Sequence, residues 1–436
     1  MMSFKSVGKE HKISANVMAP LWLETPQQWS IFKQDLAIAH KIGIRAVTVD
    51  VWWGAVEQQG DQIFDWTYYD KVFAEINNRN LKIIPIMSFH QCGGNVGDSC
   101  NIPLPQWIWQ HFPQTTTQQL QYKSEQGNYS KEFVSLWANE LVLPQYIEFM
   151  QAFEQQFQQY SGIIDELNVS MGPAGELRFP SYNQHDQGTG YPTRGAWQVY
   201  GEKQTIELQK YLIKNYPSVD LLNKEWQSNY RSFNEITIPL PNKCAAQQCK
   251  DTVAWFHQSL LNHGKKMLLA ANKGFSNAFS NISLGFKIPG IHWLMAKQGK
   301  WHRAAEIAAG LIPSEPGKGN HYANIVKLAN TELGNDRGII LHFTALEMSN
   351  NPTAPSYSMA NDLVIEVANE AKRQGVIVKG ENALAAGVTN KHGWDNINRH
   401  FQHNRFKGIT VLRLTNVTSG YGKSAFTDFI QKYTMR

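Results

Sequence analysis

Short apolar segments alternate with helical patterns along most of the chain, and this alternation constrains the fold more than any other feature. The apolar segments are near-continuous rather than alternating with polar residues. Such runs are typical of strands that are buried on both faces of a sheet. There are eight of them, spanning residues 16–23, 45–53, 82–90, 164–173, 283–293, 338–348, 376–382 and 408–416.

Helical patterns lie between several of these segments. Residues 27–42 place apolar side chains at helical spacing and stop before Gly43, a residue type that commonly ends a helix. Eight strands with intervening helices predict an α/β fold, a (β/α)8 TIM barrel. A doubly wound open sheet is the alternative, but no G-x-G-x-x-G motif follows the first segment. The other helical patterns span residues 68–80, 145–160, 255–275 and 359–375.

The sequence shows no sign of a boundary between domains. No repeat, low-complexity tract or linker divides the 436 residues, so we expect one catalytic domain over residues 1–436. Two connections are long, with about 70 residues before the fourth segment and over 100 before the fifth. Long βα loops build the active sites of barrels, so these connections predict a deep pocket.

Charge and hydropathy exclude two classes of partner. The net charge of +5 comes without a Lys/Arg-rich run, so a nucleic-acid partner is not expected. No stretch approaches the ~18–20 apolar residues of a membrane span, and residues 1–14 lack the apolar core of a signal peptide. The protein is therefore either cytoplasmic or secreted with a leader that this sequence does not contain.

The four cysteines form two close pairs along the chain. Cys92 and Cys100 are separated by seven residues, and Cys244 and Cys249 by four. Zinc sites usually show C-x2-C spacing with histidines nearby, which these pairs lack. Two local disulfides would favour an oxidising compartment and a secreted protein, whereas four unpaired thiols are the alternative.

Polar residues stand at the C-terminal ends of the predicted strands. In a barrel these ends converge on one face, and polar groups arriving there from different strands are hard to explain by packing alone. The residues are Asp50, His90, Glu176, Lys287, His292, Thr344, Glu381 and Arg413.

Two of these residues are carboxylates, which suits cleavage of a glycosidic bond. Glu176 and Glu381 follow strands on opposite sides of the barrel, which favours the wide separation of ~6.5–9.5 Å found in inverting enzymes. A structural ion pair, for example of Glu176 with Arg178, is the alternative for either residue. The glycine-rich segment "HQCGGNVGD" (90–98) predicts a lid with Asp98 at its far end.

The sequence lacks the motifs of metal sites, serine hydrolases and phosphate-binding loops. His90 and His292 are interpreted as hydrogen-bonding groups for sugar hydroxyls, because a histidine metal site needs a third ligand at workable spacing and none is evident. No G-x-S-x-G motif indicates a serine hydrolase, and no G-K-[ST] sequence follows the glycine-rich loop.

Two of these segments resemble the signatures of the β-amylases, glycoside hydrolase family 14. They are "HQCGGNVGD" (90–98) and "GPAGELRFPSY" (172–182), and shorter matches follow the family's order: "VDVWWGAVE" (49–57), "GIHW" (290–293), "FTALEM" (343–348), "GENAL" (380–384) and "LRL" (412–414). The resemblance covers residues 15–416 or so. It implies a hydrolase that releases β-maltose, with inversion, from the non-reducing ends of starch, maltodextrin or glycogen-like α-1,4-glucans.

The resemblance also implies roles for single residues. Glu176 matches the general acid and Glu381 the general base. Asp98 matches the lid aspartate, and Thr344 matches the threonine that holds the deprotonated acid between steps. The matching substrate-binding positions are Asp50, His90, Val96, Lys287, His292, Asn382, Ala383, Leu384 and Arg413.

Departures from the family pattern bear on the disulfides and on calcium. Ala345 and Phe179 replace a cysteine of plant members and the usual tyrosine, and neither touches the acid or base. The Cys92/Cys100 pair resembles the bacterial members, which have a disulfide there. No cofactor is required, but bacterial members bind a structural calcium. Glu57, Asp61 and Glu148 match three of its ligand positions. Two further positions differ, because they hold Gln62 and Gln145.

Further expectations concern additional modules, the oligomeric state and two alternative functions. The chain stops soon after the last strand, so a separate starch-binding module is not expected, and a monomer is the default state. A catalytically silent glucan-binding β-amylase-like protein is the alternative function. A retaining barrel glycosidase is a third reading, which would place its carboxylates ~5–5.5 Å apart.

Overall fold

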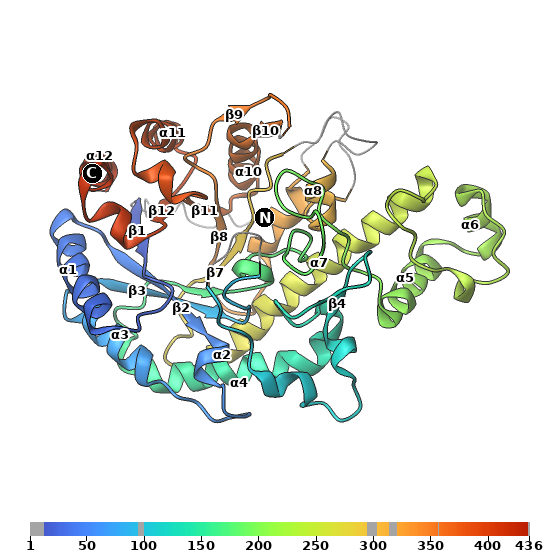
Figure 1. Cartoon of the computed structure of the whole chain (residues 1–436), viewed down its shortest axis with the longest axis horizontal. Coiled ribbons are helices and arrows are strands. Elements are labelled where there is room, and N and C mark those ends of the chain that lie inside the picture. The colour runs from blue at the N-terminus through green and yellow to red at the C-terminus, as the bar shows by residue number, and fades with distance from the viewer. Residues whose placement is uncertain (1–12, 95–99, 294–302, 314–320, 356, 435–436) are drawn as a thin grey trace, which may run out of the picture.

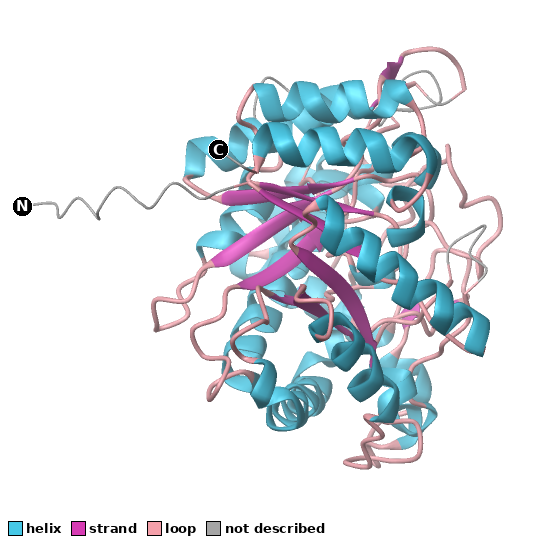
Figure 2. Cartoon of the chain, turned by 90° about the vertical axis from the view of Figure 1, so that its left-hand side faces the viewer, coloured by secondary structure: helices cyan, strands magenta, loops and turns pink. Residues whose placement is uncertain are grey.

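The computed structural model describes residues 13–94, 100–293, 303–313, 321–355 and 357–434. Within them, parallel strands close into a barrel in which each strand lies beside the next one along the chain. Figure 2 shows the strands in the middle of the molecule with helices around them. The predicted TIM barrel is therefore confirmed. Its strands are β1 (Ser14–Met18), β2 (Ala46–Trp52), β3 (Lys82–Ser88), β6 (Leu167–Val169), β7 (Leu284–Ile288), β8 (Ile339–Phe343), β11 (Ile377–Glu381) and β12 (Gly408–Val411).

The five predicted helices are present and surround the barrel (Figure 1). They are α1 (Pro26–Ile42), α3 (Thr67–Asn77), α4 (Asn139–Phe157), α7 (Ala246–Gly274) and α10 (Ala360–Gln374). The sequence patterns missed α11 (Lys391–Gln402) and α12 (Gly420–Tyr433), which flank β12. Short elements fill the connections: α2 (Trp53–Val56), α8 (Ala304–Ala308), α9 (Ala323–Lys327) and the hairpins β4 (Tyr122–Lys123)–β5 (Tyr129–Ser130) and β9 (Asn350–Asn351)–β10 (Ser358–Met359).

Helix α1 shows how local sequence sets an element's ends. The Thr25 hydroxyl accepts from the Gln28 backbone N–H, the Gln28 side chain accepts from the Thr25 N–H, and Pro26 begins the helix. At the other end Gly43 takes φ 90°, a left-handed conformation that glycine adopts without steric cost. The predicted stop at Gly43 is therefore confirmed.

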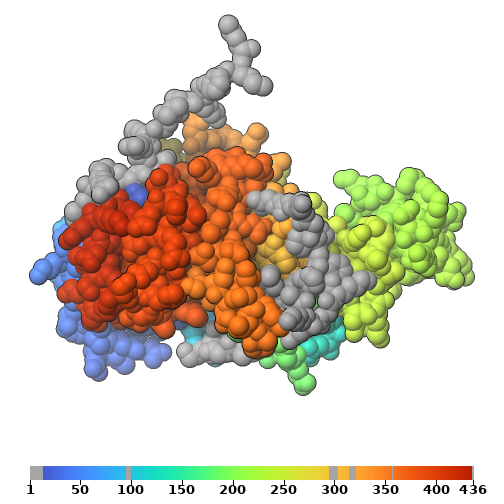
Figure 3. Space-filling view, turned by 90° about the horizontal axis from the view of Figure 1, so that it is seen from above, coloured from blue at the N-terminus to red at the C-terminus, as the bar shows by residue number. Residues whose placement is uncertain are grey.

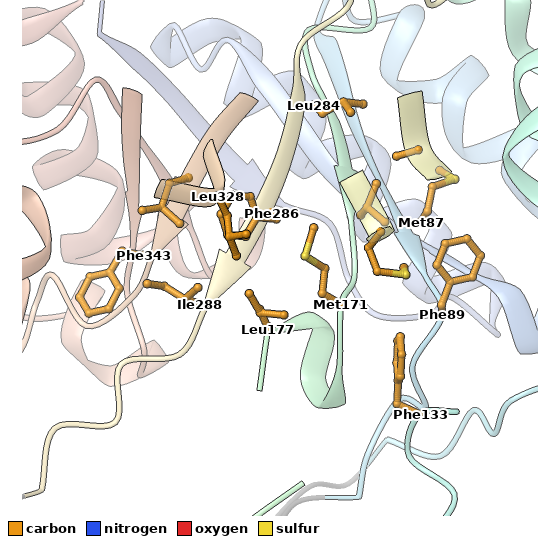
Figure 4. Close-up of a cluster of buried hydrophobic side chains, with 14 of the residues drawn as sticks. Met87, Phe89, Phe133, Met171, Leu177, Leu284, Phe286, Ile288, Leu328 and Phe343 are labelled. Carbon is orange, nitrogen blue, oxygen red and sulfur yellow. The ribbon is translucent and has the colours of Figure 1, made fainter. Parts of the chain in front are cut away.

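Successive residues of a barrel strand point alternately to the layer between the barrel and its helices and to the inside of the barrel. On β7, Leu284, Phe286 and Ile288 pack with Met171, Leu177 and Leu328 in the apolar layer between the barrel and its helices (Figure 4). Lys287, between them, points the other way into the barrel and reaches Glu381. The strands are thus buried on both faces, as their apolar runs predicted, while their inward residues carry the polar groups.

The longest connection, between β6 and β7, contributes to the pocket only through its first residues. Tyr182, Gly190 and Tyr191 line the central cavity. Further along, α5 (Glu202–Asn215) and α6 (Val219–Trp226) project from the side of the barrel (Figures 1 and 3). Most of this insertion therefore forms a lateral extension rather than a pocket wall.

Both predicted cysteine pairs are disulfides. Cys92 is bonded to Cys100 and Cys244 to Cys249, so the alternative of four unpaired thiols is wrong. The first bridge lies at the cavity, because both of its cysteines line it. No helix of the described residues is long and apolar enough to cross a membrane.

Candidate active site

A cavity of about 800 Å³ opens at the C-terminal end of the barrel strands. All but two of the predicted catalytic and substrate-binding residues line it. The two exceptions, Val96 and Asp98, lie outside the described residues. The residues brought together are Asp50, His90, Glu176, Lys287, His292, Thr344, Glu381, Asn382, Ala383, Leu384 and Arg413.

Glu176 reaches the cavity from a turn, not from the end of a strand as the sequence suggested. Strand β6 stops at Val169, and a tight turn at Pro173–Gly175 comes before the glutamate. The backbone of Glu176 then pairs with that of Lys287, and the Leu177 N–H donates to the Lys287 carbonyl at 2.8 Å. This pairing fixes the acid beside β7 although its own strand has ended.

Two partners hold the Glu176 carboxylate. Arg178 donates from Nε to Oε2 at 3.0 Å, and the Tyr182 hydroxyl donates to the same oxygen at 3.4 Å. Burial raises the pKa of Glu176 despite the opposing charges of Arg178 and Lys287, and the charge of Glu381 raises it further. The ion pair with Arg178 therefore exists, but the carboxylate it holds also faces the cavity.

Glu381 is the last residue of β11, and its side chain is only 5% exposed. Lys287 places Nζ 2.6 Å from its Oε2, and His342 places Nδ1 3.8 Å from its Oε1. A lysine and a histidine from the two preceding strands thus face this carboxylate.

The two predicted sugar-binding histidines are uncharged near neutral pH. Burial lowers the pKa of His90 to about 3, with Lys287 and Arg178 adding to the effect. Burial also lowers the pKa of His292 to about 4. His292 is oriented by the Ser358 hydroxyl, 2.7 Å from its Nδ1. Neutral imidazoles can both donate and accept, which suits hydroxyl groups of a sugar.

The segment after Glu381 is fixed by its own hydrogen bonds. The Asn382 side chain accepts from Leu412 N and donates to Leu412 O, so its amide ties this segment to the backbone that follows β12. The buried carboxylate of Glu347 accepts from Ala383 N and Leu384 N. These bonds set the direction in which the chain leaves the general-base candidate.

Several cavity residues escaped the sequence interpretation. Trp52, Tyr182, Tyr191 and Trp293 add aromatic surface, and His342 lies beneath Glu381. A period of two along the predicted strand would have found His342, since it stands two residues before Thr344. Tyr182 stands in the segment quoted for Glu176, but nothing in its spacing indicated that it contacts the carboxylate.

The three residues predicted to bind calcium lie near one another outside the cavity. Asp61 and Glu148 both raise the pKa of Glu57, which shows that these acidic groups share one neighbourhood. Both oxygens of Glu57 accept hydrogen bonds, from Trp53 Nε1 at 2.6 Å and Gln62 N at 2.7 Å. In the described parts of the chain, no group of three His, Cys, Asp or Glu side chains converges as a metal requires. Calcium binding would therefore require these side chains to converge, and calcium stays a prediction.

The fold and the cavity together define a class of protein. A (β/α)8 barrel whose C-terminal cavity holds two carboxylates with basic partners is the arrangement of a barrel glycoside hydrolase. The chain belongs to glycosyl hydrolase family 14, because the model of that family matches residues 16–435.

Individual relatives agree with this assignment. The chain is 36% identical to a β-amylase of Niallia circulans over 96% of its own length and 70% of that protein. It is 35% identical to a β-amylase of Bacillus cereus, covering 95% of this chain and 73% of the relative. The crystal structure of the catalytic domain of a Paenibacillus polymyxa β-amylase superposes with a TM-score of 0.85 at 33% identity, covering 98% of this chain and 99% of that one.

Proposed function

We propose that this protein hydrolyses α-1,4-glucosidic bonds of starch, maltodextrin or a glycogen-like glucan from the non-reducing end and releases β-maltose with inversion, the activity of a β-amylase. The observation that carries the proposal is the pair of glutamates in one cavity, Glu176 and Glu381, with different partners. Membership of family 14 and the relatives named β-amylase support the substrate class.

In this mechanism Glu176 is the general acid. It protonates the glycosidic oxygen as the bond to the anomeric carbon breaks, so it must hold a proton at working pH. The raised pKa of Glu176 supports this role. Thr344, which lines the cavity, is proposed to hold the carboxylate after it has given up its proton.

Glu381 is proposed as the general base. It accepts a proton from a water molecule, whose oxygen attacks the anomeric carbon from the face opposite the leaving group. Lys287, 2.6 Å away, stabilises the ionised carboxylate that this step needs. The proton accepted by Glu381 and the one lost by Glu176 balance, so one water is consumed for each maltose released.

The remaining cavity groups are proposed to bind sugar. Asp50, His90, His292 and Arg413 offer charged or neutral hydrogen-bonding groups, and aromatic rings such as Trp52 and Tyr191 add apolar surface. We place the lid function on Asp98 and the contact near the cleavage point on Val96, by their match to the family pattern. Leu384, 57% exposed, is proposed as an apolar contact at the rim.

The experiment that tests the proposal follows the anomer of the first product. NMR of a fresh digest of maltoheptaose should show β-maltose before mutarotation. Initial release of the α-anomer would reject inversion. The absence of any reducing sugar from soluble starch would favour the silent glucan-binding protein instead.

We also propose an extracellular location and a monomeric state. The two disulfides support an oxidising compartment, since such bonds rarely persist in the cytoplasm. Sedimentation equilibrium of the purified protein would test the monomer, and localisation of the tagged protein in its native host would test the compartment.

A further inference from the structure

A buried charged cluster lies inside the barrel beneath Glu381. It consists of Glu166, which directly precedes β6, His342 of β8 and Lys379 of β11. His342 is in register with Lys379 on one side and with Lys287 on the other, so these inward side chains form one row across three strands. Glu381 stands two residues after Lys379 and therefore faces the same interior, one layer higher.

Glu166 anchors this cluster. His342 Nε2 donates to Oε1, and Lys379 Nζ donates to Oε2 at 2.7 Å, so both carboxylate oxygens are used. The Glu166 side chain is completely buried. Gly285 leaves room for Asn168 and for Glu166, because a Cβ there would come within 1.7 Å of Asn168 Oδ1 and 2.3 Å of Glu166 Oε1. The absence of a side chain at Gly285 thus makes space for both polar groups.

The second nitrogen of His342 faces Glu381. Nδ1 lies 3.8 Å from Glu381 Oε1 and, among the described residues, is buried with no hydrogen-bond partner. A buried polar group without a partner is costly, so such groups usually have a function. Because Nε2 donates to Glu166, Nδ1 is the ring nitrogen that remains to face Glu381.

We propose that His342, held by Glu166 and Lys379, is a positioning residue that orients Glu381 and keeps it ionised. The inference rests on the proposed function, since it acts through the general base. His342 does not touch the reacting atoms in this role. Its charge links a permanently ionised carboxylate below to the catalytic carboxylate above.

The charges around Glu381 determine how much a positive charge on His342 affects it. Burial opposes the ionisation of Glu166, but Lys379 and His342 outweigh it and lower its pKa to about 2, so its negative charge is present throughout the working range. Around Glu381, Lys287 of β7 and Arg413 after β12 are positive, whereas Asp50 of β2 and Glu176 are acidic. The electrostatic effects of these positive and acidic groups on Glu381 partly cancel. In the proposed role, a positive charge on His342 therefore favours the ionised form of Glu381.

The test is the pH profile of kcat in His342→Asn, which removes the charge but keeps a polar side chain. The acidic limb should move up by about one pH unit, a tenfold loss of rate on that limb, because Glu381 is then protonated more easily. The alkaline limb, set by Glu176, should stay in place, and KM should change little. An equal fall of kcat at every pH, or no change, would overturn the proposal.

His257→Asn is the matched control. His257 is also buried, with Nδ1 2.8 Å from the Gly310 carbonyl oxygen, but it does not line the cavity. The same substitution there should lower the melting temperature without moving either limb. A shift of the acidic limb in this control would show that the effect is not specific to His342.

A second measurement does not depend on turnover or on a folded His342 variant. In 15N-histidine-labelled wild-type protein, one buried ring should keep both nitrogens protonated at the working pH, and Glu381→Gln should make that ring lose a proton at lower pH. A neutral ring throughout, or no response to Glu381→Gln, would overturn the proposal. Ordinary turnover by Glu381→Gln would instead reject the proposed function, so the two failures are distinguishable.

Discussion

Two of the cavity's carboxylates, Glu176 and Glu381, are held in opposite ways. Glu176 directly follows an irregular turn, and its basic partner, Arg178, stands only two residues further along the chain. Glu381 ends a barrel strand, and its partners, Lys287 and His342, come from other strands. The partners of Glu176 are therefore close to it in the sequence, whereas the partners of Glu381 are brought to it by the closure of the barrel.

This difference matches the two proposed roles. Burial dominates at Glu176 and raises its pKa, which suits the proposed general acid. At Glu381, the proposed general base, a lysine lies within hydrogen-bonding distance and a buried histidine faces the other oxygen. The roles can therefore be separated experimentally by changing one set of partners at a time.

The largest effect should come from removing each carboxylate. Glu176→Gln and Glu381→Gln should each lower kcat on soluble starch by 10³-fold or more, on the order of 4 kcal/mol in the barrier. The two should differ on α-maltosyl fluoride, because fluoride leaves without being protonated. Glu176→Gln should recover much of its rate on this substrate, whereas Glu381→Gln should not.

Steady-state rates on both substrates check this contrast, and fluoride release gives the rate for the second. Recovery by Glu381→Gln and not by Glu176→Gln would exchange the two assignments. Recovery by neither would mean that Glu176 does more than donate a proton.

A smaller effect should follow from Lys287→Met, because Lys287 acts on both carboxylates. It is bonded to Glu381, and its charge also lowers the pKa of Glu176. Without it both residues bind protons more tightly, so the acidic and alkaline limbs of the kcat profile should both move to higher pH. We expect kcat/KM to fall by about 10–100-fold at the wild-type optimum.

The pH profiles of Lys287→Met and His342→Asn together sharpen the comparison. The lysine variant should displace the whole profile, and the histidine variant only its acidic limb. Identical displacements would show that the two partners of Glu381 are not separable.

The sequence predicted the barrel because strands buried on both faces leave continuous apolar runs. It also predicted which residues meet at the rim, since strand ends converge in a barrel. It missed the pairing of Glu176 with the backbone of Lys287, because a turn that ends one strand and joins another leaves no periodic pattern. Glu166 and Lys379 escaped because charged residues inside a barrel contradict the apolar pattern used to find its strands.

Tyr182→Phe should produce a smaller and one-sided change. The Tyr182 hydroxyl donates to Glu176 Oε2 at 3.4 Å, while its ring lies 3.9 Å from the Arg178 guanidinium. Phenylalanine keeps the ring and loses the donor, so ionised Glu176 is less stabilised. The alkaline limb of the kcat profile should move up by a few tenths of a pH unit.

The acidic limb should stay in place in Tyr182→Phe, because the hydroxyl does not contact Glu381. Tyr200→Phe is the control, since that hydroxyl bonds the Pro239 carbonyl away from the cavity. A downward shift of the alkaline limb in Tyr182→Phe would contradict the assigned direction of the hydrogen bond.

The smallest effect concerns another buried carboxylate, Glu57, whose oxygens accept hydrogen bonds from Trp53 and Gln62 and, among the described residues, none from a lysine or arginine. Burial raises the pKa of Glu57 to about 7, and Asp61 and Glu148 add to the rise. The folded protein therefore binds a proton that the unfolded chain loses above about pH 4.5. Stability should fall as pH rises from 4.5 to 7, and Glu57→Gln should flatten this fall, by about 2 °C in Tm between pH 5 and pH 8.

The same melting curves test calcium. A bound divalent cation would stabilise ionised carboxylates, so added Ca²⁺ should raise Tm at pH 8 more than at pH 5, and excess EDTA should reverse the rise. Glu57→Gln should respond less than the wild type. Equal melting temperatures with Ca²⁺ and with EDTA would reject the ion, leaving Glu57 as a carboxylate kept protonated by burial, in contrast to Glu381, which has a lysine to balance its charge.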